Sequence, residues 1–271
     1  MASCRTCHHW WLDLGAAGWS RLRRALACAD GPPARPHESA MQRIPEPELM
    51  DQAEQVLQYA MADFHNSDQD CLAAILSLLH SAPTWRARVI DLGCGPGNIS
   101  FPLAAALPSA RVLAIDGSGP MLAWARQRQG NTLPPPANLR FHQALLPLGR
   151  AELACVEAAH APPYTLVVSN SLLHHLHDPL GLWRTVREIA APGALLLVRD
   201  LRRPACRQEL LELVSRHAAS APALLRRDFE ASLAAAFRRE EVEAQLEQAG
   251  LGQLTVREVG DRYLDVLGRL P

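Results

Sequence analysis

The stretch VIDLGCGPGNIS (Val89–Ser100) joins an apolar run to three glycines at alternate positions. The first four residues predict a β-strand, because they are apolar apart from Asp91 and are followed directly by turn residues. Glycines tolerate positive φ in a tight turn, and without a Cβ atom they let a ligand touch the main chain. A helix that begins after them would direct unpaired N–H groups at that ligand. The stretch therefore predicts a binding turn between a strand and a helix.

The chain around this turn alternates between strand-like and helix-like segments. Apolar strands are expected at 88–92, 111–115, 139–142, 165–169 and 194–198. Helices are expected at 99–106, 120–129, 150–159 and 180–190. Two further strands, 254–259 and 263–267, are separated by a short turn and indicate an antiparallel hairpin. Such alternation predicts an α/β fold with a mostly parallel sheet covered by helices.

The sequence predicts that the chain divides into three parts. Residues 1–40 predict a poorly ordered extension, residues 41–86 an N-terminal helical cap, and residues 87–271 the core. The cap contains two helical patterns, the first within 45–64 and the second at 71–80. A long segment at about 202–249, rich in Arg, Glu, Ala and Leu, predicts two or three helices that form a lid.

The extension contains a Cys-x-x-Cys-His motif at Cys4–His8 that formally matches haem attachment. That chemistry needs an exported chain, and no signal-peptide pattern precedes the motif. Zinc binding by Cys4, Cys7, His8 or His9 together with Cys28 is the second alternative. We favour an extension with neither role.

Composition excludes several classes of function. The 271 residues carry a net charge of −1, so there is no general attraction to nucleic acid or anionic membranes. All 27 basic residues are arginine, so an arginine here does not by itself indicate anion recognition. No apolar run approaches the roughly 20 residues that span a bilayer. Seven scattered cysteines do not suggest a disulfide framework, and we expect a cytoplasmic setting.

The glycine turn fits two kinds of ligand. Dinucleotide-binding folds require a glycine three positions after the second one, where this chain has Asn98. Asp91 would repel a pyrophosphate, whereas it would attract an ammonium group. The turn therefore favours a ligand with a cationic end over a dinucleotide.

Four ordered segments resemble one family. VIDLGCGPGNIS resembles motif I of the class I S-adenosylmethionine-dependent methyltransferases, and VLAIDGSGPML (Val112–Leu122) resembles their second motif. YTLVVSNSLLHHLHDP (Tyr164–Pro179) resembles the segment around strand four, and REIAAPGALLLVRD (Arg187–Asp200) the approach to strand five. The resemblance covers about residues 88–200 and implies a Rossmann-like seven-stranded sheet with S-adenosylmethionine as cofactor. The segment after strand four lacks the Asn-Pro-Pro-Tyr signature of nucleic-acid and protein methylators, which favours the small-molecule branch.

The resemblance implies roles for particular residues. Asp91 would hold the methionine ammonium, and Asp116 would accept the ribose hydroxyls, although Asp116 also stands where a helix cap is expected. The family often has an acid after strand three for the adenine amino group, and here Gln143 and Ala144 stand in that place. The other residues implied at the cofactor are Gly93, Cys94, Gly95, Gly97, Gly117, Ser118, Met121, Asn170 and Tyr59.

His174, His175 and Asp200 are the candidate catalytic residues. A histidine facing the acceptor would polarise or deprotonate it, and Asp200 ends the fifth strand beside the expected acceptor site. His175-Leu176-His177-Asp178 partly resembles a metallohydrolase ligand set but lacks a further histidine, so no metal site is predicted. Arg199, Arg202 and Arg203 are compatible with an anionic acceptor or with a solvated loop.

These features predict S-adenosylmethionine-dependent methyl transfer to a small-molecule acceptor. The reaction would be an in-line displacement driven mainly by positioning and exclusion of water. The alternative is a non-catalytic scaffold or interaction protein with a methyltransferase fold; a dinucleotide oxidoreductase comes third. The sequence leaves the acceptor and the oligomeric state open.

Overall fold

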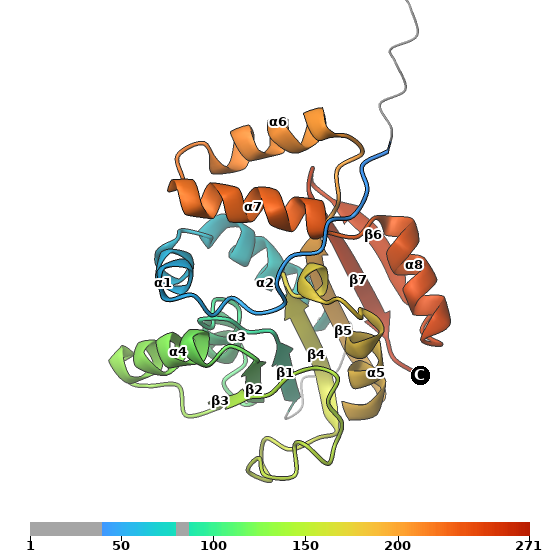
Figure 1. Cartoon of the computed structure of the whole chain (residues 1–271). Coiled ribbons are helices and arrows are strands. Elements are labelled where there is room, and N and C mark those ends of the chain that lie inside the picture. The colour runs from blue at the N-terminus through green and yellow to red at the C-terminus, as the bar shows by residue number, and fades with distance from the viewer. Residues whose placement is uncertain (1–39, 80–86) are drawn as a thin grey trace, which may run out of the picture. The chain divides into compact units, whose positions relative to one another are not determined.

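The computed structural model describes residues 40–79 and 87–271 as parts of one unit, Ala40–Pro271. The Cys4–His8 motif and the rest of the expected extension to Ser39 lie outside the described residues. Seven strands form one sheet at the centre of Figure 1. In chain order they are β1 (Arg88–Leu92), β2 (Arg111–Asp116), β3 (Leu139–Gln143), β4 (Tyr164–Asn170), β5 (Ala190–Leu201), β6 (Thr255–Val259) and β7 (Tyr263–Arg269).

The sheet has the strand order β3-β2-β1-β4-β5-β7-β6. The first five strands pair in parallel, whereas β7 is antiparallel to both β5 and β6. The predicted Rossmann-like sheet with an antiparallel final hairpin is therefore confirmed. The chain moves outward from β1 to β2 and β3 and then returns to β4 on the other side of β1. This reversal opens a crevice at the carboxyl ends of β1 and β4, which is where such sheets bind ligands.

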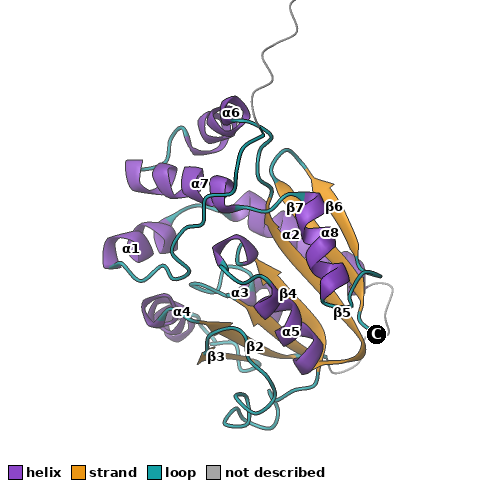
Figure 2. Ribbon diagram, turned by 45° about the vertical axis from the view of Figure 1, so that its right-hand side comes forward, coloured by secondary structure: helices purple, strands orange, loops and turns teal. Residues whose placement is uncertain are grey.

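Alternate residues of each strand enter two different cores, one on each face of the sheet. Val89 packs in one core with α2 (His65–Leu79), α3 (Ser100–Ala106) and α4 (Gly119–Asn131). Ile90 packs in the other with α5 (Leu180–Ile189) and α8 (Arg239–Gln248). Figure 2 shows α5 and α8 together in front of the sheet. Helices thus cover both faces, as the period-two pattern of doubly buried strands requires.

The segment after β5 contains three helices, which fall into two groups. α6 (Arg207–Ala218) and α7 (Ala223–Ala235) share an apolar cluster built around Leu201 and Leu213. They lie side by side at the top of Figure 1, whereas α8 packs with α5 in the core that contains Ile90. α1 (Ala53–Met61) contacts α7, and Gln55 donates a hydrogen bond to Asp228 at 3.0 Å. These contacts place α6 and α7 beside the N-terminal helix.

The first helix begins at Ala53, so the helical pattern expected from Pro45 onward is wrong over its first turns. Residues 41–52 instead run in an extended path beside α7, coloured blue in Figure 1. The backbone N–H of Ile44 donates to Ala234 at 3.0 Å, and the Arg43 guanidinium donates to Ala235 at 2.6 Å. Hydrogen bonds to another element therefore replace those of a helix in this segment.

The helix expected over Arg150–Ala159 is also wrong, since this stretch forms successive turns. Its backbone bonds are of the i to i−3 kind, such as Ala154 to Ala151 and Val156 to Leu153. Leu153 is fully buried, but most neighbouring side chains are exposed. A helix gains most of its stability from packing one face, so an alanine-rich stretch without such a face does not hold a helix.

No helix among the described residues is long and apolar enough to cross a bilayer.

Candidate cofactor and acceptor site

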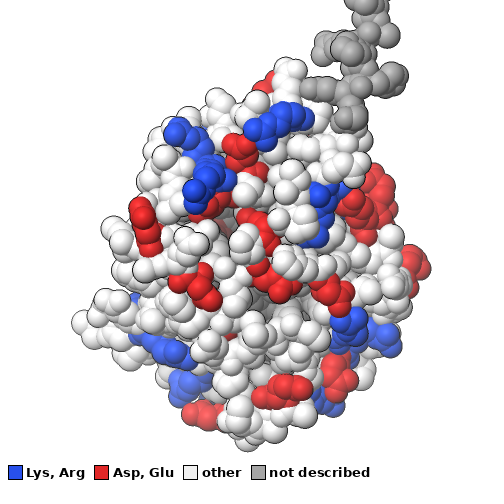
Figure 3. Space-filling view, in the orientation of Figure 1, with Lys and Arg blue, Asp and Glu red and all other residues white. Residues whose placement is uncertain are grey.

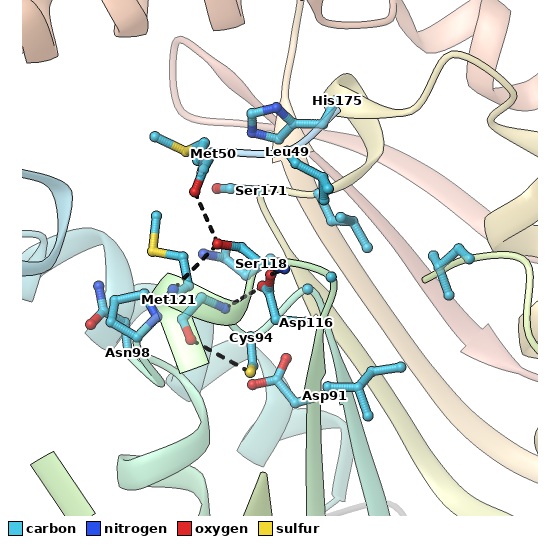
Figure 4. A pocket seen from close by; sticks show the side chains of 18 of the residues that line it. Leu49, Met50, Asp91, Cys94, Asn98, Asp116, Ser118, Met121, Ser171 and His175 are labelled. Atoms are coloured by element: carbon cyan, nitrogen blue, oxygen red, sulfur yellow. Dashed lines mark hydrogen bonds between the residues drawn. The ribbon is translucent and has the colours of Figure 1, made fainter. Parts of the chain in front are cut away.

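A pocket opens at the carboxyl ends of β1, β2 and β4, where the crevice in the sheet predicts one (Figure 4). The predicted site residues that line it are Asp91, Gly93, Cys94, Gly95, Asp116, Gly117, Ser118, Met121, Ala144, Asn170, His175 and Tyr59. Most of the residues implied at the cofactor thus surround a single cavity.

The glycine turn adopts the left-handed backbone that its sequence predicts. Gly93, Gly95 and Gly97 have φ values of 73°, 52° and 87°. The backbone N–H groups of Gly93 and Cys94 both donate to Ile115 at 2.9 Å, which fixes the turn against β2. A Cβ atom on Gly93 would lie 2.8 Å from Leu172, so this position also needs glycine for space.

Replacing Gly93 with alanine is expected to lower the free energy of unfolding by about 2–5 kcal/mol. A left-handed residue with a side chain costs roughly 1–2 kcal/mol, and overpacking against Leu172 adds about 1–3 kcal/mol. Gly193→Ala is a matched control, because Gly193 has the same φ of 73° with nothing within 4 Å of its Cβ position. Urea unfolding of both variants measures the difference, and equal losses would contradict the role given to Leu172.

Asp91 is buried at the end of β1, with 1% of its surface exposed. The Ser100 hydroxyl donates to its carboxylate at 2.5 Å. Burial raises the pKa of Asp91 to about 7, and the bond from Ser100 lowers it in part. The carboxylate therefore lacks a positive partner among the described side chains and lines a pocket, which is the setting for a cationic ligand.

Asp116 ends β2 and accepts two backbone hydrogen bonds. The Gly95 N–H donates to Oδ2 at 2.7 Å and the Ser118 N–H to Oδ1 at 2.8 Å. Burial raises the pKa of Asp116 above its ordinary value, although both bonds oppose the shift. Asp116 does not cap α4, because Ser118 is the cap and accepts from the Met121 N–H at 3.3 Å. Asp116 thus ties the glycine turn to β2 and keeps oxygen lone pairs for a ligand.

Two residues implied at the cofactor do not line the pocket. Gln143 is exposed, and its side-chain amide donates to the Gly117 carbonyl at 3.0 Å, which turns it outside the cavity. Gly97 supports the turn from below, since its Cβ position lies 2.7 Å from Phe101. Leu145 occupies the place beside Gly117 where an adenine contact from Gln143 was expected.

Several pocket residues were missed by the sequence analysis. Glu48, Leu49 and Met50 line the pocket from the segment before α1, and the Ser118 hydroxyl donates to the Met50 carbonyl at 3.0 Å (Figure 4). Asp68 on α2 also lines it, and burial raises the pKa of Asp68 to about 6. Glu48, Leu49 and Met50 belonged to the stretch assigned to the first helix, and no signal in the sequence singles out Asp68.

The three candidate catalytic residues come together, but only His175 lines the pocket. His174 lies in the short helix η1 (Leu173–His175), and its Nδ1 is hydrogen-bonded to the Asp200 carboxylate. Asp200 also accepts from the Leu201 N–H at 2.6 Å and from the His174 N–H at 3.3 Å. Glu46, which the sequence analysis missed, contacts both histidines from the segment before α1.

This group of buried side chains has shifted pKa values. Burial would lower the pKa of His174, but the charge and hydrogen bond of Asp200 outweigh it and raise the pKa. Burial and the neighbouring His174 lower the pKa of His175 to about 3, so its imidazole is neutral. Burial raises the pKa of Glu46, partly opposed by His174.

The arginines at the end of β5 and directly after it pair within the protein, so the structure does not bring them to an anionic acceptor. Arg199 forms two hydrogen bonds to the buried Asp265, at 2.6 and 2.8 Å. Arg203 pairs with Glu241 at 2.5 Å, and Arg202 reaches Glu258 at 3.6 Å. The described residues that line the pocket include four acids and no arginine. Figure 3 shows acidic side chains gathered near the middle of the face drawn there.

A mostly parallel sheet of this order with an antiparallel final hairpin, a glycine turn after β1 and carboxylates at the ends of β1 and β2 are the features of the class I S-adenosylmethionine-dependent methyltransferase fold. The model of a methyltransferase domain family matches residues 90–196. Over this domain the chain is similar to the class I S-adenosylmethionine-dependent methyltransferases.

Curated relatives and solved structures agree with this. The chain is 32% identical over 127 residues to a trans-aconitate 2-methyltransferase of Streptomyces avermitilis, which covers 46% of this chain and 42% of that one. It is 37% identical over 113 residues to the enzyme of that name from Methylobacterium nodulans, covering 42% and 38%. A SAM-dependent methyltransferase from Aquifex aeolicus has the same fold, with a TM-score of 0.54, 17% identity and coverage of 80% and 98%. The chain thus matches less than half the length of these curated relatives.

Proposed function

We propose that this protein binds S-adenosylmethionine and transfers its methyl group to a small-molecule acceptor. One observation carries the proposal: Asp91, the glycine turn and Asp116 meet in one pocket at the point where the strand order reverses. A scaffold protein that no longer bound the cofactor would have no need for two buried carboxylates there, because each costs stability without a partner. The pocket therefore supports binding over the scaffold alternative.

Each part of the cofactor has a suited partner. The Asp116 carboxylate would accept the ribose hydroxyls, and Asp91 would face the methionine ammonium. Met121 is buried and would pack under the adenine, while Tyr59 would cover the methionine end, since its ring lies 3.9 Å from the Cβ position of Gly95. S-adenosylmethionine supplies an activated methyl group, so the protein mainly has to align the acceptor and exclude water. Alignment of this kind is worth roughly 7–11 kcal/mol in intramolecular reactions.

The acceptor would enter at the end of the pocket formed by Asn170, Ser171 and His175. We include His174, His175 and Asp200 on the acceptor side, because they lie at the ends of β4 and β5 and away from Asp116. The paired helices α6 and α7 would form the lid, since α7 contacts both α1 and η1. Four free cysteines among the described residues are consistent with a cytoplasmic protein.

The acceptor itself is a narrower question. Trans-aconitate, the substrate named for the two relatives, is one candidate, but their similarity covers less than half of either chain. The acidic pocket wall does not by itself attract an acid. A small molecule with a hydroxyl, enol or carboxyl oxygen is the class we propose.

The experiment is methyl transfer from isotope-labelled S-adenosylmethionine. Purified full chain is incubated with trans-aconitate in one arm and with a fractionated metabolite extract in another, and products are identified by mass. A labelled small molecule formed by the wild type and not by Asp116→Ala would support the proposal. Calorimetry with S-adenosylhomocysteine distinguishes a methyltransferase from a non-catalytic scaffold. Absence of binding would favour the scaffold.

Cofactor affinity is expected to rise with pH up to about 7. A folded pKa of about 7, against an ordinary 3.8, means that the empty pocket keeps the Asp91 proton until near neutrality. Because folding raises the pKa of Asp91, the cofactor-free protein should lose stability as pH rises from about 4 towards 7. Over this range the unfolded chain has already released the Asp91 proton, whereas the folded protein still holds it. An ammonium beside Asp91 must displace the proton, so binding should be about eightfold weaker near pH 6 than near pH 7.5.

Calorimetry at several pH values measures this dependence. Asp91→Asn should weaken binding and flatten the pH profile, whereas Asp68→Asn, the same change at another pocket acid with a raised pKa, should keep most of the pH dependence. A wild-type profile that is level over this range would contradict the protonated Asp91.

A further inference from the structure

Glu46, His174 and His175 direct their polar atoms at one point. Nε2 of His174 lies 3.4 Å from Oε1 of Glu46, and Nδ1 of His175 lies 3.3 Å from the same oxygen. One ligand atom from each of the three residues lies within 4.8 Å of the others. All three side chains are withdrawn from solvent, with 12%, 3% and 13% of their surfaces exposed.

These separations match those between two ligands of one metal ion. An N–H···O bond is normally 2.7–3.2 Å long, and both contacts exceed that range. Two ligands placed about 2.0–2.1 Å from a zinc ion at a tetrahedral angle are about 3.3–3.4 Å apart. The separation of Oε1 of Glu46 from each histidine nitrogen therefore equals that between two ligands of one zinc ion.

Asp200 orients His174 in the way that metal-binding histidines need. Its carboxylate accepts a hydrogen bond from the Nδ1–H of His174, and in that tautomer the lone pair of Nε2 faces Glu46. Asp200 is itself held by the Leu201 N–H at 2.6 Å. A carboxylate behind a histidine fixes its tautomer and makes the opposite nitrogen a stronger ligand.

We propose that Glu46, His174 and His175 bind a divalent transition-metal ion of the zinc class, with Asp200 as the positioning residue behind His174. His175 also lines the cofactor pocket, so the ion lies at its acceptor end. Three protein ligands leave a fourth position for an oxygen of the acceptor, whose pKa the ion lowers. The role in catalysis rests on the proposed function, whereas metal binding does not.

The surrounding polar groups are compatible with an ion. Ser232 donates to Oε1 of Glu46 at 3.0 Å, which leaves that oxygen a further lone pair, and the Pro47 carbonyl lies 3.4 Å from Nδ1 of His175, a contact that an ion at Nδ1 would replace. The nearby Arg43 guanidinium is occupied, since it donates to the carbonyls of His174, Leu176 and Ala235 at 2.9, 3.0 and 2.6 Å. Glu46 and Asp200 together balance the charge of a divalent ion.

The set differs from the one considered in the sequence. His177 is more than half exposed and bonds to the Glu46 carbonyl at 2.9 Å, and Asp178 pairs with Arg184 at 2.6 Å. Neither belongs to the cluster. Glu46 was missed because it lies 128 residues before His174 in the chain, and only the fold brings the two together.

The test is zinc binding by the full chain after removal of metal with a chelator, in the absence of S-adenosylmethionine. Cys4→Ser/Cys7→Ser serves as the background, because the sequence analysis gives those thiols as an alternative zinc site. Zinc alone is titrated against a chromophoric chelator. Glu46→Gln is compared with Glu48→Gln, the matched change of the next acid along the segment, whose carboxylate bonds to the His177 N–H at 2.7 Å.

The background protein is expected to bind one zinc ion per chain. Glu46→Gln should weaken binding at least about tenfold and Asp200→Asn about 10–100-fold, while Glu48→Gln leaves it within about twofold. If the background protein binds no zinc, the proposal is overturned and His174 remains a candidate base. Equal zinc affinity in Glu46→Gln and Glu48→Gln would also overturn the proposal.

Cobalt keeps the proposal testable if Glu46→Gln does not fold. The background protein loaded with Co²⁺ should show the intense visible bands of a tetrahedral site without thiolate charge-transfer bands; weak octahedral bands would overturn the assignment. Asp116→Ala should bind zinc like the background, so failure of cofactor binding and failure of metal binding are read separately.

Discussion

Asp116→Ala is expected to bind S-adenosylhomocysteine at least about 100-fold more weakly than the wild type. A hydrogen bond to a charged group contributes about 1.5–3 kcal/mol, and two ribose hydroxyls would lose such a partner. The sum of roughly 3 kcal/mol or more corresponds to about two orders of magnitude in the dissociation constant. Isothermal titration calorimetry measures the change directly.

Two controls separate recognition from stability, since Asp116 also accepts from Gly95 and Ser118. Ser118→Ala removes the cap of α4 and should cost about 1 kcal/mol of stability, so it measures how far a local loss of stability beside Asp116 weakens binding. Asp70→Ala removes an exposed acid from α2 and should change neither. If Asp116→Ala bound as tightly as Ser118→Ala, the ribose contact would be excluded.

Arg199→Met should lower the free energy of unfolding by about 3–5 kcal/mol, the largest loss of stability expected for a single change here. Arg199 of β5 stands directly opposite Asp265 of β7, and both side chains are almost fully buried. Removing the arginine leaves a buried carboxylate whose remaining partner is Arg257 at 2.9 Å. Removing one partner of a buried ion pair destabilises the protein by more than the intact pair stabilises it, because the remaining charge is buried without solvation or a full partner.

Arg257→Met is the matched control. Arg257 contacts the same carboxylate, but its side chain is 49% exposed, so its loss should cost no more than about 1 kcal/mol. Arg199→Met/Asp265→Leu should recover most of the stability, since no unpaired charge stays behind. Urea unfolding reads all three variants, and similar losses for Arg199→Met and Arg257→Met would show that the pair is not effectively buried.

The sequence predicted the sheet because each of its strands carries a local signal. Apolar runs such as Val89–Leu92 lie between turn residues, and Ser118-Gly119-Pro120 marks a helix start that the structure confirms. The cofactor side of the pocket followed from the same stretches, because glycine and aspartate at fixed offsets from a strand end face the crevice. The errors fell where packing decides the conformation, as in residues 45–52 and 150–159.

The acceptor side was predicted less completely for a physical reason. His174 and Asp200 could be named because each follows the end of a strand, and they do meet. Glu46 and Asp68 come from segments whose position depends on tertiary contacts with α7 and the sheet, which leave no local pattern. The sequence could not decide whether Arg199 contacts an anionic acceptor or lies in a solvated loop. Its actual partner, the buried Asp265, depends on the register of β7.

The segment before α1 and the helices α1 and α2 supply Glu46, Tyr59 and Asp68, all of which lie outside residues 90–196. A chimera that exchanged only residues 90–196 with a relative would therefore carry over donor recognition and leave much of the opposing wall behind. The proposed acceptor side is divided between the shared domain, which holds His174 and His175, and the rest of the chain, which supplies Glu46 and Asp200. Similarity confined to residues 90–196 therefore supports the methyl donor but does not identify the molecule that receives the methyl group.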